Sequence, residues 1–283
     1  MLIVNITTTS KRLQLCSATV LSLTQQSLLP EKIIVWISKE PYLSDEGILE
    51  VPQWIKNINE LLKINDNSFH DLIEFRYTEN TGPYRKIVPI LREINSSSLN
   101  DTIVYADDDV IYGIDWLKKM VKLFNDNQGL YVVAPRVRVI KKNIFNVNKS
   151  YNLFPISTRS EIIGTDFIIT GVGGCVLSRK HIDTNFLLLN DFLDIAPTTD
   201  DIWISKIIEL SGSKVLTCPS ALIDVQEISH CNDALNLINT LQNNRKKYFN
   251  ILLKILVRVK SYFGVSLSTN DANLKKVNIF FDK

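Results

Sequence analysis

The chain has 283 residues, of which 45% are hydrophobic and 22% are charged, and its formal net charge is +2. This composition allows a sizeable buried core and excludes an intrinsically disordered chain. The small net charge argues against a nucleic-acid-binding protein. No apolar stretch reaches the roughly 18 uncharged residues that a membrane-spanning helix needs, and the N-terminus resembles a strand rather than a signal peptide. We therefore expect a soluble or peripheral protein of the cytoplasm, with its four cysteines reduced.

The first half of the chain alternates between two kinds of hydrophobic pattern. Strands are predicted at 2–7, 32–38, 72–77, 101–106 and 130–134. Helices are predicted at 13–26, 54–64, 84–94 and 115–124. Pro89 lies in the third of these helices, either near its start or at a kink. This alternation predicts βαβ units and an α/β fold, a Rossmann-like, mainly parallel sheet flanked by helices.

Beyond residue 136 the pattern is looser. The segment 136–152 predicts a strand and a long loop, and the apolar segment 167–178 contains three glycines. Further helices are predicted at 201–210, 233–243 and 245–263, with a short strand at 214–217.

The run Asp107-Asp108-Asp109 directly follows the apolar strand 101–106. Ligands of a mainly parallel sheet bind outside the carboxyl ends of its strands. Three adjacent carboxylates at a partly buried turn repel one another, and a divalent cation removes that repulsion. Mg²⁺ and Mn²⁺ prefer oxygen ligands, often one or two carboxylates plus substrate phosphates. We predict that Asp109 binds the metal directly, that Asp107 supports it as a ligand or through ribose or metal-bound water, and that Asp108 has the least defined role.

Other readings of the acidic run remain open. It is also compatible with a solvated turn that caps the next helix, although Asp115 is already placed to cap that helix. An aspartyl phosphatase motif fits poorly, because Ile111 stands where Thr or Val is expected. A nucleotidyltransferase would carry a glycine-rich loop after its first strand, whereas residues 7–12 contain no glycine.

Several motifs occur together in one order along the chain. Gly82-Pro83-Tyr84-Arg85-Lys86 is followed by Asp107 to Asp109 with Tyr112, and then by Asp115-Trp116-Leu117. Gly171-Val172-Gly173-Gly174, Ala196-Pro197-Thr198-Thr199-Asp200-Asp201-Ile202-Trp203 and Asn232-Asp233 come later. Over roughly residues 1–240 this order resembles bacterial, family-2-like glycosyltransferases of the GT-A fold that build surface polysaccharides. Cys175-Val176 after the glycines, and His230-Cys231 before Asn232, depart from the family's pattern and concern the acceptor pocket.

The resemblance implies a single catalytic GT-A domain over residues 1–240, with a nucleotide-binding half at 1–115 and an acceptor half at 116–240. Residues 241–283 would form a C-terminal helical extension. It also implies a hexosyltransferase with a nucleotide-diphosphate sugar donor, a UDP-sugar by family precedent. The implied cofactor is Mn²⁺ or Mg²⁺, and the acceptor is a hydroxyl of a glycan or of a lipid-linked molecule.

On the donor side, the Gly82-Pro83 turn precedes Lys86 at the start of a predicted helix. A helix N-terminus together with an ammonium group suits a diphosphate, and the alternative is a solvated surface lysine. Arg12 would contact the base or the diphosphate, or else lie on the face of a helix. Thr7-Thr8 would line the base or ribose pocket.

On the acceptor side, Asp200-Asp201 stand before the helix 202–210, so one of them is expected to cap it. We predict Asp201 as the general base for the acceptor hydroxyl and Asp200 as the cap or an acceptor ligand. A helix N-terminus is expected to lower the pKa of such a carboxyl group. The predicted reaction is a single in-line displacement with inversion.

The glycines at 171, 173 and 174 do not form a dinucleotide-binding motif, because Val176 stands at the place of its last glycine. They predict a tight turn where the backbone passes close to another group. We expect that group to be the sugar, bound near Gly173 and Gly174.

Residues 245–260 contain six basic residues and no acidic ones. With the apolar residues between them they predict a basic amphipathic helix, 245–263, suited to an anionic membrane surface on the inner face of the cell membrane. A helix docked on the domain or a dimer contact is the alternative.

Three functions stay open from the sequence. The first is an inverting glycosyltransferase, and the second is a retaining one or a related nucleotide-sugar enzyme. The third is a non-catalytic member that binds a membrane or a partner, which the presence of Lys86, Asp109 and Asp201 disfavours.

Overall fold

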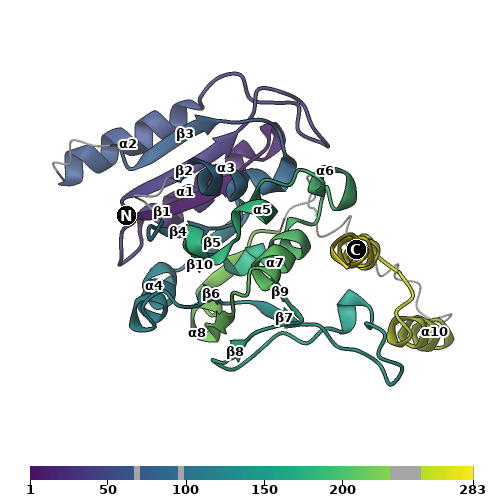
Figure 1. Ribbon diagram of the computed structural model, residues 1–283. Helices are drawn as coiled ribbons and strands as arrows, with labels where there is room; N and C mark the ends of the chain where they lie inside the picture. Colours follow the sequence, from purple (N-terminus) through teal and green to yellow (C-terminus); the bar gives the residue numbers. More distant parts are fainter. Residues whose placement is uncertain (67–70, 95–98, 230–249, 283) are drawn as a thin grey trace.

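The computed structural model describes residues 1–66, 71–94, 99–229 and 250–282. Its centre is an eight-stranded sheet with the order β3-β2-β1-β4-β10-β6-β11-β8 (Figure 1). The strands are β1 Leu2–Thr7, β2 Lys32–Ile37, β3 Ile73–Tyr77, β4 Thr102–Tyr105, β6 Val132–Ala134, β8 Ile162–Ile163, β10 Cys175–Leu177 and β11 Val215–Thr217. β1 to β4 run parallel, and β10 runs antiparallel to both neighbours. The predicted mainly parallel α/β sheet flanked by helices is confirmed.

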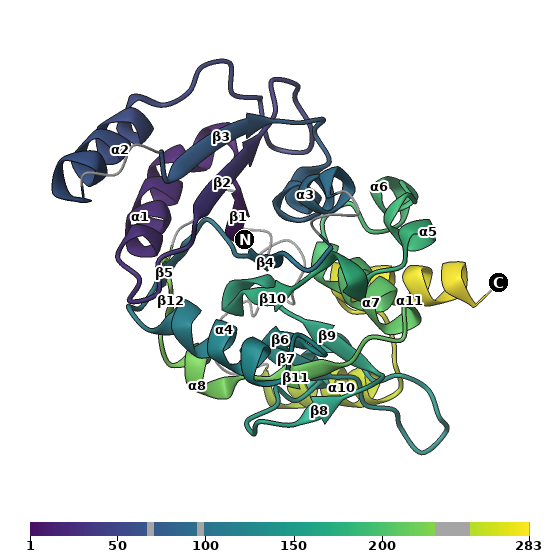
Figure 2. The ribbon, with the colours of Figure 1, turned by 60° about the vertical axis from the view of Figure 1, so that its left-hand side comes forward.

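Helices cover both faces of this sheet. Figure 2 shows α1, α2 and α4 on one side and α3, α5, α6 and α7 on the other. The helices are α1 Leu13–Thr24, α2 Gln53–Asp66, α3 Val88–Glu93, α4 Trp116–Asp126, α5 Thr184–Leu187, α6 Phe192–Ile195, α7 Asp200–Leu210 and α8 Pro219–Leu222.

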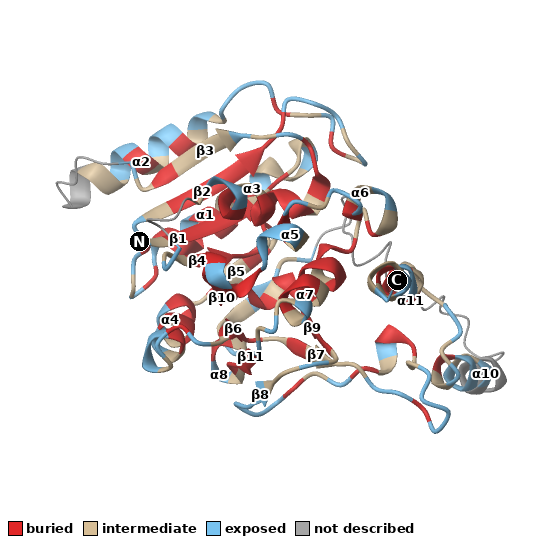
Figure 3. Cartoon of the chain, in the orientation of Figure 1, coloured by how far each residue is buried: buried red, intermediate tan, exposed pale blue. Residues whose placement is uncertain are grey.

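Each central strand supplies both layers of the core, because successive side chains of a strand point to opposite faces. In β1, Ile3 packs in the cluster below α3 and α7, while Val4 and Ile6 pack in the cluster below α1 and α4. In β2, Ile34 packs in the first of these clusters and Ile33 in the second. The central strands β1, β2 and β4 are therefore buried over most of their length (Figure 3), which explains why their sequences are mainly apolar rather than alternating.

Two small sheets lie beside the main one. β5 (Val110–Tyr112) pairs with β12 (Val225–Glu227), and β7 (Val137–Val139) pairs with β9 (Phe167–Ile169). β7 is the strand predicted within 136–152. The glycine segment 171–174 connects β9 to β10.

The single helix predicted at 84–94 is wrong. The chain instead forms a 3₁₀ turn, Gly82–Lys86, and then α3, with Ile87 between them. Pro89 lies in the first turn of α3, where its missing N–H costs nothing, whereas inside a continuous helix it would remove a hydrogen bond.

The C-terminal part forms two helices, α10 (Asn250–Tyr262) and α11 (Thr269–Phe281), of which α11 was not predicted. Ser268 and Asp271 form a capping box at the start of α11. α11 packs against α7, with the rings of Phe280 and Phe281 at 5.5 and 5.0 Å from that of Trp203. Part of the C-terminal extension therefore completes the core of the domain.

Some predictions concern residues outside the described ranges: the helix 233–243, residues 245–249 of the basic helix, the motif residues His230, Cys231, Asn232 and Asp233, and the proposed boundary at residue 240. The cysteines within the described ranges, Cys16, Cys175 and Cys218, are buried free thiols. Among the helices that the structure describes, none combines the length and hydrophobicity required to cross a bilayer.

Candidate functional site

The strand order brings two loops of the sequence together. β1 and β4 are neighbours in the sheet, and the carboxyl ends of adjacent parallel strands meet at one edge. The loop after β1 carries Arg12, and the loop after β4 carries the three aspartates. Arg12 Nη2 accordingly lies 2.5 Å from Asp108 Oδ1 and 2.8 Å from Asp109 Oδ2.

The aspartate loop is fixed by hydrogen bonds from α1 and β5. The Thr19 hydroxyl donates to the Asp108 carbonyl (2.8 Å) and accepts from the Val110 N–H (3.2 Å). The Asp107 N–H donates to the Tyr112 hydroxyl (3.1 Å). These contacts satisfy three backbone groups of the turn and fix its position without using the aspartate side chains.

Lys86 joins the aspartate loop to α7. Its ammonium lies 2.7 Å from Asp107 Oδ1 and 2.9 Å from Asp200 Oδ2, and its side chain is 6% exposed. The expected position at a helix start is wrong, since Lys86 ends the 3₁₀ turn Gly82–Lys86. The alternative of a solvated surface lysine is excluded by this burial.

Neither Asp200 nor Asp201 caps α7, contrary to the prediction. Thr199 is the N-cap residue, and the two aspartates occupy the first turn. Asp201 Oδ1 instead accepts the N–H of Gly171 (3.0 Å), so the carboxylate ties the glycine turn to α7. Asp115 is also no side-chain cap of α4, because its carboxylate accepts the Ser27 hydroxyl (2.6 Å).

The carboxyl groups of the cluster are harder to ionise than usual. Burial raises the pKa of Asp108 to about 6, although Arg12 opposes this effect. Burial and the neighbouring Asp200 raise the pKa of Asp201 well above its usual value, against the effect of Lys86. The expected lowering by the helix N-terminus is therefore wrong for Asp201, because desolvation outweighs the helix dipole.

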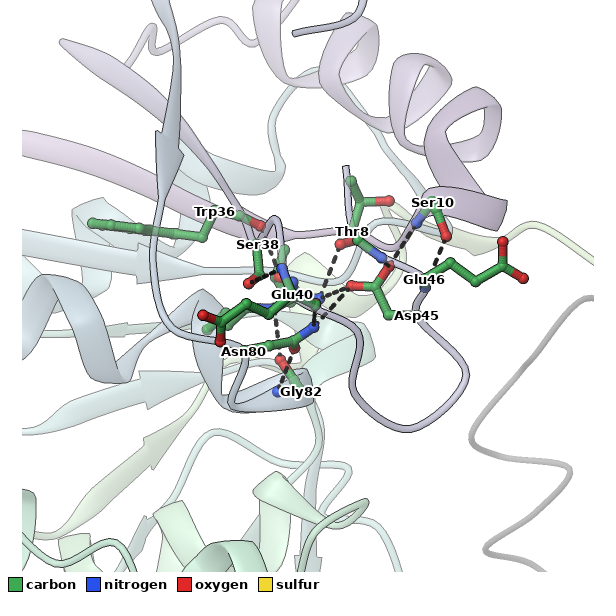
Figure 4. Close-up of polar contacts among 12 residues, drawn as sticks. Thr8, Ser10, Trp36, Ser38, Glu40, Asp45, Glu46, Asn80 and Gly82 are labelled. Atoms are coloured by element: carbon green, nitrogen blue, oxygen red, sulfur yellow. Dashed lines mark hydrogen bonds and ion pairs between the residues drawn. The ribbon is translucent and has the colours of Figure 1, made fainter. Parts of the chain in front are cut away.

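A second polar cluster lies at the end of β2 and centres on Asp45 (Figure 4). Asp45 Oδ1 accepts the backbone N–H groups of Ser10 (3.0 Å) and Gly47 (3.1 Å). Asp45 Oδ2 lies 3.0 Å from Arg85 Nη2, and both side chains are almost fully buried. Arg85 also donates to the carbonyl of Thr8 (3.1 Å). This ion pair links the loops that follow β1, β2 and β3.

A cavity of about 270 Å³ lies between these clusters. Its lining includes all predicted site residues except Gly173 and Gly174: Thr7, Thr8, Arg12, Gly82, Pro83, Lys86, Asp107, Asp108, Asp109, Asp200 and Asp201.

The glycine turn 171–174 packs closely against residues of the site. A Cβ on Gly171 would lie 2.6 Å from Lys86 Nζ and 2.7 Å from Asp107 Oδ1. A Cβ on Gly173 would meet Arg136, and one on Gly174 would lie 2.3 Å from the ring of Trp116. The close neighbours of the turn are thus the Lys86–Asp107 pair and two other side chains, which the sequence did not reveal.

The carboxylate cluster fits the divalent cation that the sequence resemblance implies. Burial, together with Asp109 and Asp200, raises the pKa of Asp107 against the effect of Lys86, so a cation bound beside this carboxylate would stabilise its ionised form. Asp108 Oδ2 is buried and has no hydrogen-bond partner among the described residues. Within those residues no group of three or more metal-binding side chains already converges. Carboxylate oxygens completed by substrate phosphates are the usual ligand set of Mg²⁺.

Sequence reasoning missed several residues that line the cavity: Tyr42, Asp45, Arg85, Arg136, Arg138, Tyr151 and Asn270. The alternation Arg136-Val137-Arg138-Val139 was a usable signal, since it places both arginines on one face of a strand. Asp45 gave no such signal, because its importance depends on contacts with three separate loops.

No model of a known protein family matches the chain, and no curated protein matches its sequence. Solved structures similar to it include GalNAc-T7, determined with UDP, GalNAc and Mn²⁺, at 14% identity, a TM-score of 0.49 and coverage of 91% of this chain. Residues 1–349 of S. aureus TarS are 14% identical to it, with a TM-score of 0.43 and coverage of 83% of this chain. The cytidylyltransferase IspD of Francisella tularensis is 13% identical to it, with a TM-score of 0.42 and coverage of 83% of this chain.

The chain covers 48% of GalNAc-T7, 59% of that TarS fragment and 96% of IspD. It thus spans about half the length of the first of these proteins. Identities and TM-scores at this level do not assign an activity.

Proposed function

We propose that the chain is a metal-dependent glycosyltransferase of the type that builds surface polysaccharides. It would move a sugar from a nucleotide-diphosphate donor, a UDP-sugar, to a hydroxyl of a glycan or lipid-linked acceptor. The observation that supports this best is the position of Lys86, whose buried ammonium contacts both Asp107 and Asp200. The Lys86 ammonium thus connects the loop of Asp107 to Asp109 with α7, the helix that carries Asp201.

The nucleoside would lie at the end formed by the loops after β1 and β2. Arg85 Nη1 is buried there with no hydrogen-bond partner among the described residues. Buried polar groups in native proteins are nearly always satisfied, so a bound base or ribose would supply this contact. The Asp45–Arg85 pair holds this end rigid.

The diphosphate would lie between Arg12 and Lys86. Lys86 has three N–H donors and two carboxylate partners, which leaves one donor for a phosphate oxygen. Asp109 and Asp107 would hold the divalent cation, which would neutralise the charge that develops on the leaving diphosphate.

Asp201 would act as general base. The acceptor oxygen attacks the anomeric carbon while its proton passes to Asp201. The bond from that carbon to the diphosphate oxygen breaks, and the electron pair stays on the nucleoside diphosphate. One displacement inverts the anomeric centre, and a product with retained configuration would instead support the retaining alternative.

The exposed face of α10 is the proposed membrane contact. Leu256 and Val259 are about half exposed beside the exposed Arg258 and Lys260. Apolar and basic side chains side by side suit an anionic lipid surface, and this contact would bring the enzyme to a lipid-linked acceptor on the cytoplasmic leaflet.

The proposed function is tested by a donor-hydrolysis screen. Purified full-length protein is incubated with UDP-, GDP- and dTDP-sugars and Mn²⁺, and the released nucleoside diphosphate is measured. We expect release from one nucleotide class and loss of release with EDTA. Asp109→Asn should lower the rate by about two orders of magnitude, because charge stabilisation by the metal contributes several kcal/mol.

Asp126→Asn is the matched control, because Asp126 is an exposed aspartate of α4 that pairs only with Lys122 among the described residues. It should leave the rate unchanged. Full activity of Asp109→Asn would contradict the metal assignment, and no release from any donor would contradict the proposed function itself.

A further inference from the structure

The wall of the cavity beside Asp201 carries two arginines from one strand. Arg136 immediately precedes β7 and Arg138 lies within it. Side chains two residues apart in an extended strand share a face, and both arginines line the cavity. Tyr151 lines it next to them, as does Asn270 from the first turn of α11.

Arg138 is held in a fixed orientation with donors to spare. Its guanidinium carbon lies 4.9 Å from the centre of the Tyr151 ring, and its Nη1 donates to the carbonyl of Phe154 (2.9 Å). Its Nε is buried and has no partner that meets hydrogen-bond geometry among the described residues, and a side-chain interaction with the Tyr151 hydroxyl, which lowers the pKa of Tyr151, helps to orient the guanidinium. A guanidinium stacked on an aromatic ring is pre-organised for an oxyanion, because little side-chain entropy remains to be lost.

Arg136 has a weaker partner than Arg138. Its Nη1 lies 3.3 Å from Glu227 Oε1, and the Glu227 side chain is 56% exposed. Ion pairs at such exposure contribute little, so a ligand anion can replace Glu227. Gly173 lies against the backbone and Cβ of Arg136, and Gly171 of the same turn donates its N–H to Asp201, so the glycine turn contacts both residues.

These groups are close enough to influence one another electrostatically. Burial raises the pKa of Tyr151 to about 12, and the negative charge of Asp201 adds to this rise. Arg138 and Arg136 oppose it. Tyr151 therefore lies within the electrostatic field of both the proposed base and the two arginines.

We propose that Arg138 and Arg136 bind an anionic oxygen group, a phosphate or a carboxylate, on the acceptor close to the hydroxyl that reacts. The inference rests on the proposed function, because it assigns the acceptor end of the same cavity. The anion would lie against the Arg138 guanidinium, with Arg136 exchanging Glu227 for it. A preference for phosphate would indicate a lipid-phosphate or phosphodiester-linked acceptor, and a preference for carboxylate would indicate an acceptor that contains an acidic sugar.

The test is calorimetric titration of the full-length protein saturated with UDP and Mn²⁺. The probes are glucose 6-phosphate, glucuronate and methyl glucoside. We expect at least one anionic probe to bind about tenfold or more tightly than the neutral one, as a charge-assisted hydrogen bond contributes more than the 1.4 kcal/mol that equals a factor of ten. Preference for the phosphate or for the carboxylate probe identifies the source of the anion.

Arg138→Gln should abolish this preference and leave the affinity for UDP within about twofold of wild type. Arg138→Lys keeps the positive charge but loses the planar, two-pronged guanidinium, so it should retain part of the preference that Arg138→Gln loses. Arg159→Gln, at an exposed position outside the cavity lining, is the matched control and should change nothing.

Two results would overturn the inference. One is equal affinity of the wild-type protein for all three probes. The other is a loss of UDP affinity in Arg138→Gln as large as the loss of anionic-probe affinity, which would place the guanidinium in the donor half. Retained UDP binding shows that the variants are folded, and if wild-type protein binds UDP but no anionic probe, the inference fails while the proposed function stands.

Discussion

Asp201 combines a raised pKa with a position in the cavity wall. The raised pKa results from burial and from Asp200, and it improves a carboxylate as a proton acceptor. The same burial makes the charged form costly for the folded state. The burial that makes Asp201 a better proton acceptor therefore also lowers the stability of the folded state when Asp201 is charged, a trade-off that is common at active sites.

Asp201→Asn should lower the rate of sugar transfer by about 10²- to 10⁴-fold, the usual contribution of a general base. The same change should raise the melting temperature at pH 8. The folded-state pKa lies above the unfolded value, so the charged carboxylate destabilises the fold at high pH and this penalty disappears as the pH falls toward the unfolded pKa.

Calorimetric melting of wild type and Asp201→Asn between pH 4 and pH 8 measures this effect, with Asp126→Asn as control. The difference in melting temperature should shrink on acidification. Transfer by the wild type should increase with pH up to the folded pKa of Asp201. An unchanged rate in Asp201→Asn would place the base elsewhere.

At the scale of elements, α11 supports the start of α7. Asn273 Nδ2 donates to Thr199 Oγ1 (3.1 Å) in a buried contact, and Thr199 is the N-cap residue of α7. Asp200 and Asp201 follow directly. The C-terminal helix therefore controls the position of two carboxylates more than 70 residues earlier in the sequence.

Asn273→Ala should lower the unfolding free energy by about 1 kcal/mol, because it removes one buried hydrogen bond. It should also lower kcat for sugar transfer more than it raises KM for the donor, since the donor half of the cavity is untouched. Melting curves and steady-state kinetics measure the two effects. The control is Lys276→Ala, at an exposed position of the same helix. A loss of stability with unchanged kcat would show that α11 is only structural.

At the scale of the whole molecule, the two C-terminal helices differ in environment. α11 buries Leu274 and Val277 against the domain, while α10 exposes Leu256 and Val259. A chain truncated before α10 would also lose α11 and uncover Trp203. Membrane binding is therefore better tested by point substitutions than by truncation.

The double variant Leu256→Glu, Val259→Glu should bind anionic vesicles several-fold more weakly than wild type, because it removes apolar contacts and adds negative charge. Co-sedimentation with vesicles that contain phosphatidylserine measures this. Ile279→Glu, on the exposed face of α11, is the control. Failure of wild type to sediment with anionic vesicles, or equal sedimentation of the double variant, would contradict the proposed contact.

Local sequence patterns were sufficient to predict those parts of the fold that depend on residues close together in the chain. The strands β1 to β4 and their parallel direction follow from apolar runs separated by helices, and the position of Asp107 to Asp109 at a strand end follows from them. The capping box of Ser268 and Asp271 is a further local pattern, because both of its residues lie within four positions of each other in the sequence. The single helix at 84–94 failed because Pro89 is a helix breaker in the interior and a helix starter in the first turn.

By itself, the sequence determined the α/β class, the strand ends and the residue types available for chemistry. Only the tertiary structure decided which of these residues meet. The strand order brings Arg12 into ion pairs with Asp108 and Asp109. The packing of the loop after β3 brings the buried Lys86 into contact with Asp107 and Asp200. Asn273 of α11 donates a hydrogen bond to Thr199 at the start of α7. The physical reason is that secondary structure follows from local periodicity, whereas ion pairs, desolvation and the resulting pKa values depend on groups distant in the chain.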